Sequence, residues 1–199
     1  MTRIQALTLA VALTAAVLSL GASDAAPTPA DSLHAARYDG TRLLRPDDLD
    51  RWVFLGASLG MDYNNTTFSP ESPGAFHVVL MEPSAYEYFM KHGRYADGSM
   101  FLLSFYDTQR GVSVDRAGYV PGALSAFEIH VIDRARYTEK HAFFPFAKDD
   151  AKADVLPPGS PCVQCHVPKG AYEGTFTQFY PPIRARVPVK TEPEAPATR

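Results

Sequence analysis

The sequence predicts a single domain of the α+β class, built on an antiparallel β-sheet with flanking helices. Strand patterns crowd the middle of the chain, whereas helical patterns lie near its start and its C-terminal end. This arrangement favours an antiparallel sheet over a four-helix bundle or a small all-helical fold. About 175 residues follow the apolar leader, which is enough for one domain with a hydrophobic core.

The first element is expected to be a helix. Proline near the start of Leu44–Leu49, followed by two acids, is typical of a first helical turn. Leu49, Trp52 and Val53 would then form its apolar face, and the glycines of Gly56–Gly60 would end it.

The next segments predict strand, helix and strand. Phe76–Glu82 is a short apolar β run, and Pro83 ends it and starts a helix over Ser84–His92, with Gly93 at the C′ position. After the Asp-Gly turn, Ser99–Tyr106 is expected to be a strand.

Ala126–Asp133 alternates between two kinds of side chain, which is typical of a strand with one buried face. Its apolar positions are Phe127, Ile129 and Val131. Glu128 and His130 fall on the opposite face. His141–Phe146 predicts a last strand, and Ala171–Tyr180 a last helix that stops at two prolines.

Cys162–His166 reads Cys-Val-Gln-Cys-His, the pattern that attaches one haem c covalently. The two thiols form thioether bonds to the haem, and the adjacent histidine, His166, ligates the iron. Cys162 and Cys165 are the only cysteines of the chain, and Val167–Gly170 after them is expected to turn the chain back.

Three other interpretations of the cysteine pair carry less support. A thioredoxin-like redox pair would need a βαβ context, and a zinc site would need a second Cys/His pair. A disulfide across two residues would close too small a ring to add much stability.

Residues 1–25 are typical of a secretory signal peptide and predict a periplasmic protein. Arg3 precedes the apolar run Ile4–Leu20, and Ser23-x-Ala25 suits signal peptidase. An uncleaved anchor is the alternative, although Gln5 and two threonines interrupt the run.

The folded domain is predicted to span residues 33–186. Residues 26–32 and 187–199 are expected to be disordered, because proline, small and charged residues dominate them. The net charge of −3, with no basic patch, argues against a nucleic-acid partner.

At this point the chain resembles the mono-haem cytochromes called P-460 and their cytochrome c′-beta relatives. The matching segments are Arg51–Val53, Val78–Tyr86, Gly93–Ser99, Cys162–His166 and Phe176–Pro181. The resemblance implies a β-sheet domain with a haem c near the C-terminus, usually a periplasmic homodimer. It also implies an iron with an open distal side for a small ligand.

The two branches of this family differ at one residue. In the hydroxylamine-oxidising branch, a lysine from the strand after the Asp-Gly turn is cross-linked to the haem. The same position here is Leu103, and no lysine occurs between Lys91 and Lys140. The resemblance therefore favours the branch that binds nitric oxide in an apolar distal pocket, here expected to include Phe101, Leu103 and Phe105.

Glu128 favours the other branch, because it falls where that branch keeps a catalytic distal carboxylate. Apolar neighbours would raise its pKa and let it act as a general base. The alternative is a polar side chain on an exposed sheet face.

The resulting hypothesis is an open iron site that binds or converts small nitrogen ligands, with nitric oxide binding or scavenging favoured over hydroxylamine oxidation. A redox partner cytochrome would fit either task. The alternative is a six-coordinate electron-transfer cytochrome c, and a sensor domain is a weaker one.

A sixth ligand could in principle come from His77 or His130, although both are expected to point outward. The methionines that could serve instead, but are more typical of core filler, are Met61, Met81, Met90 and Met100. Phe176, Phe179 and Tyr180 are expected to pack on the haem or the sheet, and Arg184 and Arg186 to lie at the surface or pair with propionates.

Overall fold

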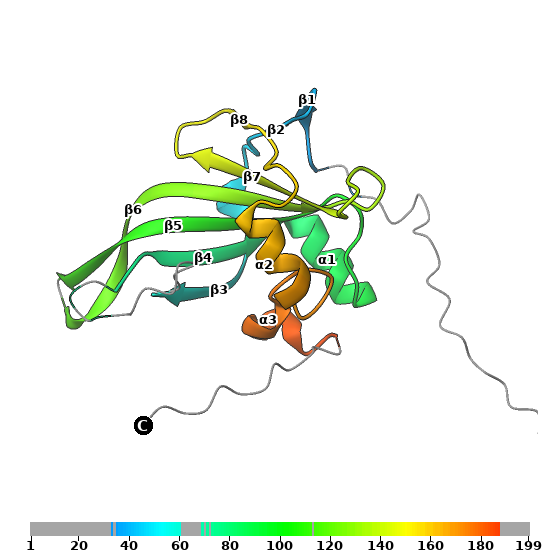
Figure 1. Ribbon diagram of the computed structural model, residues 1–199. Helices are drawn as coiled ribbons and strands as arrows, with labels where there is room; N and C mark the ends of the chain where they lie inside the picture. Colours follow the sequence, from blue (N-terminus) through cyan, green and yellow to red (C-terminus); the bar gives the residue numbers. More distant parts are fainter. Residues whose placement is uncertain are drawn as a thin grey trace, which may run out of the picture.

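The computed structural model describes residues 33, 35–60, 69, 71, 73–112 and 114–187 (Figure 1). The predicted signal peptide, residues 26–32 and residues 188–199 of the predicted tail lie outside this range. The α+β prediction is confirmed, since two antiparallel sheets are flanked by a few helices. Within the described residues, no helix has the length and apolar character needed to cross a bilayer.

The central sheet has five antiparallel strands whose order in the sheet is their order in the chain. They are β3 (Val53–Leu59), β4 (Phe76–Met81), β5 (Ser99–Val112), β6 (Asp115–Ile132) and β7 (His141–Ala147). The predicted strands in the regions of β4 and β7 are confirmed, and the strand predicted at Ala126–Asp133 is the last part of β6. The strand predicted at Ser99–Tyr106 is only the first part of β5, which forms a long hairpin with β6 (Figure 1).

A small second sheet covers part of the central one. It pairs β1 (Tyr38–Asp39), β2 (Arg42–Leu44) and β8 (Lys152–Ala153). Leu43 and Ala153 from this sheet are buried against the central strands. One face of the central sheet is thereby closed.

The helix expected at the start of the domain is wrong. Only a 3-10 turn, η2 (Leu49–Arg51), forms, and Val53 already begins β3. Pairing of β3 with β4 in the sheet outweighs the helical start signal, which is local and weak. Gly56 fits here because a Cβ would lie 3.0 Å from the Tyr180 ring.

The predicted central helix is confirmed as α1 (Pro83–His92). The Glu82 carboxylate caps its first turn by accepting hydrogen bonds from the backbone N–H groups of Ser84 and Ala85, at 3.1 and 2.8 Å. Gly93 ends the helix with φ of 69°, a left-handed conformation that glycine adopts without strain.

The C-terminal predictions are wrong in two places. Val167–Lys169 is not a turn, because α2 (Pro161–Lys169) continues through it and the chain turns only after Gly170. Ala171–Tyr180 is a tight β-bridge followed by the 3-10 turn η3 (Thr177–Phe179). The helix α3 (Pro181–Arg184) starts at the prolines that were expected to stop it, since proline suits the first helical turn.

The strands separate two hydrophobic clusters. One contains the alternating side chains Phe127, Ile129 and Val131, as predicted, and packs under the small sheet. The other lies with α1 and α3 and includes Phe89, Tyr95 and Ile183. Val187, the first residue of the predicted tail, is buried in this second cluster.

Candidate haem-binding site

A cavity of about 800 Å³ lies between the central sheet and the C-terminal helices. Its volume is within the usual range for small-molecule and cofactor sites. The sheet contributes Gly56, Ala57, Ser58, His77, Val79, Phe101, Leu102, Leu103, Glu128 and His130. The C-terminal segment contributes Pro161, Gln164, Cys165, His166, Lys169, Thr175, Phe176, Phe179, Tyr180 and Ile183.

Helix α2 presents the predicted attachment residues on one side. Cys162, Cys165 and His166 are three and four positions apart, and residues at these spacings are neighbours on a helix surface. Cys165 and His166 line the cavity, and the Cys162 thiol contacts the cavity residue Glu128. Neither thiol is in a disulfide.

His166 is held by its Nδ1 atom. This nitrogen lies 2.8 Å from the Gly174 carbonyl oxygen, so the ring N–H donates there and Nε2 keeps its lone pair. Burial lowers the pKa of His166, partly opposed by that hydrogen bond, and favours the neutral ring. A neutral imidazole with its other nitrogen anchored to the backbone is the form that ligates metals.

The donor set fits a haem c. Two thiols outside any disulfide and a neutral imidazole come from one short helix. Cys165 and His166 line the largely apolar cavity, and Cys162 contacts its wall at Glu128. Aromatic rings surround the imidazole, with the centroids of Phe143 and Phe176 at 4.8 and 4.7 Å from that of His166. Such a site can bind a large flat cofactor with a thioether link and a histidine ligand.

Glu128 lies in the cavity wall and not on an exposed face. It pairs across the strands with Leu103, so both side chains share one face of the sheet. The Cys162 thiol donates to its Oε2 atom at 3.3 Å. Burial raises the pKa of Glu128, with the thiol hydrogen bond opposing, and burial beside this carboxylate raises the pKa of Cys162 to about 12.

The other two predicted distal residues also lie in the wall. Phe101 is buried and Leu103 is half-buried. Phe105 lies further along the same strand face, where its ring packs on His77 with centroids 4.9 Å apart, and it does not line the cavity.

His77 and His130 were expected to point outward, and this expectation is wrong. Both are buried and both line the cavity. His130 is hydrogen-bonded through Nε2 to Nδ1 of His141 at 2.9 Å, and burial holds its pKa well below the usual range. The alternation in β6 puts His130 on the same face as Glu128, and this was the available signal that His130 could line the same site.

His130 also contacts the proposed iron ligand. Its ring centroid lies 5.1 Å from that of His166, at 70°. Two rings in such contact leave no room for a haem plane between them. His130 therefore lies on the same side as His166 and does not supply a ligand from the opposite side.

The structure also places the methionines, arginines and aromatic residues that the sequence suggested for the haem site. Among the described methionines, Met81 and Met100 are core residues, and Met90, a residue of α1, packs against the second hydrophobic cluster. None of the three lines the cavity, and Met61 lies outside the described residues. Arg184 and Arg186 are exposed. Phe176, Phe179 and Tyr180 line the cavity.

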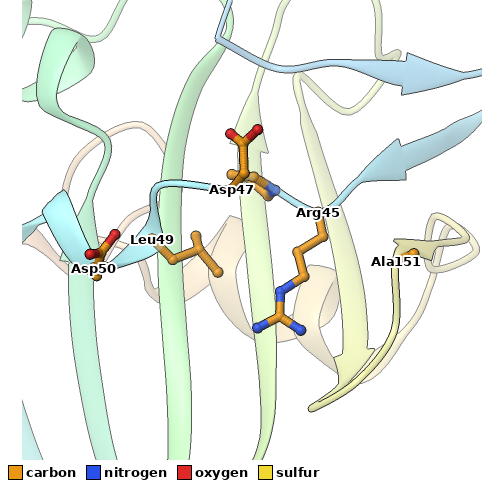
Figure 2. A pocket seen from close by; sticks show the side chains of 6 residues that line it. Arg45, Asp47, Leu49, Asp50 and Ala151 are labelled. Carbon is orange, nitrogen blue, oxygen red and sulfur yellow. The ribbon is translucent and has the colours of Figure 1, made fainter.

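A second hollow, of about 580 Å³, lies near Arg45 on the other face of the sheet (Figure 2). The Arg45 guanidinium stacks over Phe127 at 5.0 Å and donates to the Lys148 carbonyl. Asp47 pairs with Arg37 at 3.3 Å, and Figure 2 shows the carboxylates of Asp47 and Asp50 pointing away from Arg45. Arg45 and Asp47 are thus engaged in contacts within the folded domain.

Comparison with known protein families points to the same cavity, beside Cys162 and Cys165. No curated protein matches the chain significantly. The profile of the family described as Cytochrome P460 matches residues 46–177, which is well over half of the chain and includes Glu128, both cysteines and His166. The chain belongs to the cytochrome P460 family.

Proposed function

We propose that this protein carries one haem c and uses its open distal side to bind small nitrogen ligands, with nitric oxide favoured over hydroxylamine as the natural ligand. The observation that carries the proposal is the cavity wall opposite α2. Its sheet side is apolar at Phe101 and Leu103 and carries one half-buried carboxylate, Glu128.

Three residues would hold the cofactor. Cys162 and Cys165 would form the thioether bonds, and Nε2 of His166 would ligate the iron. When bound, the haem supplies an iron that can take a small ligand at its open position.

Leu103 is the residue that favours nitric oxide binding over hydroxylamine oxidation. It lies directly across from Glu128, at the position where the oxidase branch has its cross-linking lysine. Leucine cannot form that bond, and the cavity-lining lysine, Lys169, comes from α2 and not from a strand. The apolar part of the wall, at Phe101 and Leu103, offers a bound water no hydrogen-bond partner but admits a ligand that needs none.

Glu128 supports hydroxylamine conversion as the second candidate. A half-buried carboxylate with a raised pKa can accept a proton from a bound substrate. Thioether formation would consume the Cys162 S–H and so remove the hydrogen bond that now lowers this pKa. The carboxylate would then hold its proton to higher pH.

The alternative from another class is a six-coordinate electron carrier. Its second ligand would have to come from the wall away from His166. His77 is the other buried histidine that lines the cavity, so it is the residue to test.

Optical spectra of the reduced protein, with and without nitric oxide or carbon monoxide, test the proposal. A high-spin spectrum that changes with either gas is expected. A low-spin spectrum indifferent to carbon monoxide in the wild type, but responsive in His77→Phe, would establish the electron-carrier alternative. Leu43→Val, in the small sheet that covers the face away from the cavity, is the control and should match the wild type.

The proposal extends to export and assembly. The predicted signal peptide supports a periplasmic location, and the family resemblance supports a homodimer and a redox partner cytochrome. Phe54, 57% exposed on the edge strand β3, is an apolar side chain available for such a contact. Sedimentation of the haem-loaded protein as a monomer at micromolar concentration would contradict the dimer.

A further inference from the structure

The loop that follows α2 has an unusual backbone at the point where it meets His166. Glu173 has φ of 44° and Gly174 has φ of 66°. Positive φ is common for glycine but uncommon for glutamate, and it persists only when the surroundings enforce it. Contacts with the surrounding residues must therefore hold the backbone of Glu173 in this conformation.

An ion-pair chain holds it. Arg134 donates to Glu173 Oε1 at 2.7 Å through one guanidinium nitrogen and to Asp97 Oδ1 at 2.8 Å through another. Asp97 is 4% exposed and also accepts the Arg134 backbone N–H at 3.0 Å. The guanidinium thus connects the loop to a buried, doubly bonded carboxylate, a rigid geometry that suits arginine.

A second set of contacts holds the other side of Gly174. The Tyr95 hydroxyl lies 3.2 Å from Thr175 Oγ1 and 3.0 Å from Thr177 Oγ1, and all three residues are buried. Thr175 Oγ1 also lies 2.7 Å from the Tyr172 carbonyl oxygen, to which it donates. Gly174 is therefore fixed from both neighbours.

Gly174 transmits this order to the proposed iron ligand. Its carbonyl oxygen accepts the His166 Nδ1–H at 2.8 Å. A Cβ at Gly174 would lie 2.6 Å from the His141 ring, so the backbone at Gly174 packs closely against that ring. The direction of this carbonyl decides the ring orientation of His166 and the strength of its Nδ1 hydrogen bond.

We infer that the Arg134–Glu173 ion pair is a positioning device that sets the Gly174 carbonyl and, through it, the donor strength of His166 toward iron. This inference rests on the proposed function and deepens it. A strong Nδ1 hydrogen bond makes the imidazole a better donor, which strengthens the iron–histidine bond and favours the ferric state. Neither Arg134 nor Glu173 lines the cavity, so both act through the loop.

Glu173→Gln tests it in the haem-loaded protein. The amide keeps the size of the side chain but loses the charge that Arg134 binds. We expect a lower iron–histidine stretching frequency in the resonance Raman spectrum of the ferrous protein. A few-fold shift of the ferric–ferrous equilibrium toward ferrous should accompany it. Arg134→Lys, which keeps the charge but cannot serve both carboxylates, should shift both readouts in the same direction by less.

Asp39→Asn is the matched control, because it neutralises the acid of another 2.7 Å ion pair, Lys152–Asp39, on the small sheet. It should leave both readouts unchanged. A shifted potential with an unchanged stretching frequency in Glu173→Gln would mean a simple charge effect and would overturn the inference. Unchanged values for both would overturn it too, while leaving the proposed function intact.

The two proposals fail in distinguishable ways. A wild-type protein without covalent haem, or without an iron–histidine stretching band, would overturn the proposed function and this inference together. If Glu173→Gln does not fold, judged by circular dichroism, Arg134→Lys decides alone with the same two readouts.

Discussion

The two faces of the central sheet come from the same strands but differ in what they bury. One face carries Phe127, Ile129 and Val131 in a continuous apolar core under the small sheet. The other carries Glu128 and His130 at the intervening positions, and these line a cavity of about 800 Å³. A single alternation thus builds a close-packed layer and a site from adjacent residues.

The difference separates stability from chemistry. Apolar side chains on the packed face stabilise the fold when they are buried, because they leave no polar group without a hydrogen-bond partner. On the cavity face, a carboxylate and histidines are buried at a cost, which shifts their pKa values. Tolerance to substitution should therefore differ between the faces.

The largest expected effect is loss of the cofactor. Replacing both Cys162 and Cys165 with serine should abolish covalent haem, and each single change should weaken its retention, because each thiol would supply one thioether bond. Haem staining after denaturing electrophoresis and acid–acetone extraction measure this. Haem that can be extracted freely from the wild type would contradict covalent attachment.

The next effect compares the faces directly. Ile129→Ala should lower the free energy of unfolding by about 2–5 kcal/mol, since its fully buried side chain leaves a void. Leu103→Ala, on the cavity face, should cost less than about 2 kcal/mol, because its half-buried side chain already borders open space. Urea denaturation of the cofactor-free proteins measures both. Equal losses would show that the faces are packed alike.

A smaller effect is expected from Glu128→Gln. Because burial raises the pKa of Glu128 in the folded protein, the wild type should lose stability as pH rises from the unfolded pKa through the folded one. The glutamine variant should lack that loss and be at least as stable at neutral pH. Unfolding measured from pH 4 to pH 8 (about the carboxyl range and above) tests this.

The same variant should also change the pH dependence of nitric oxide binding or of any hydroxylamine turnover. Glu128 would act there through its charge, so a wild-type pH profile in Glu128→Gln would remove it from the reaction. Glu139→Gln, on a surface turn, is the control and should match the wild type in both measurements.

The last prediction is that no cross-link joins a lysine to the haem, so no spectral or mass change is expected. Leu103 predicts a mass equal to the protein plus unmodified haem c and an ordinary reduced Soret band. Lys169→Gln should change neither, although Lys169 lines the cavity. A red-shifted reduced band in the wild type that disappears in Lys169→Gln would show that a lysine from α2 reaches the haem.

Local patterns were sufficient for part of this molecule. The proline start and the glycine end of α1, and the alternation in β6, are properties of neighbouring residues, so they were predictable. The Cys162–His166 pattern is similarly local, and it indicated the side of the molecule on which the cavity lies.

The errors occurred where distant contacts decide. The sequence in the region of β3 predicts a helix, because the pairing of β3 with β4 is not visible in its own residues. The burial of His77 and His130 depends on α2 and α3 covering the sheet, and the hydrogen bond from His166 to Gly174 depends on the loop after α2. The alternation in β6 places His130 on the same face as Glu128, but no periodicity in the sequence encodes that this face is covered.

The strand order has a consequence for how the protein assembles. Each strand from β4 to β7 pairs with the one before it in the chain, so the central sheet needs only short-range closures and can form early. Residues 161–187, which cover the cavity, come last. The wall containing Phe101, Leu103 and Glu128 can therefore stand open while a large flat cofactor enters, and the finished core need not unfold to admit it.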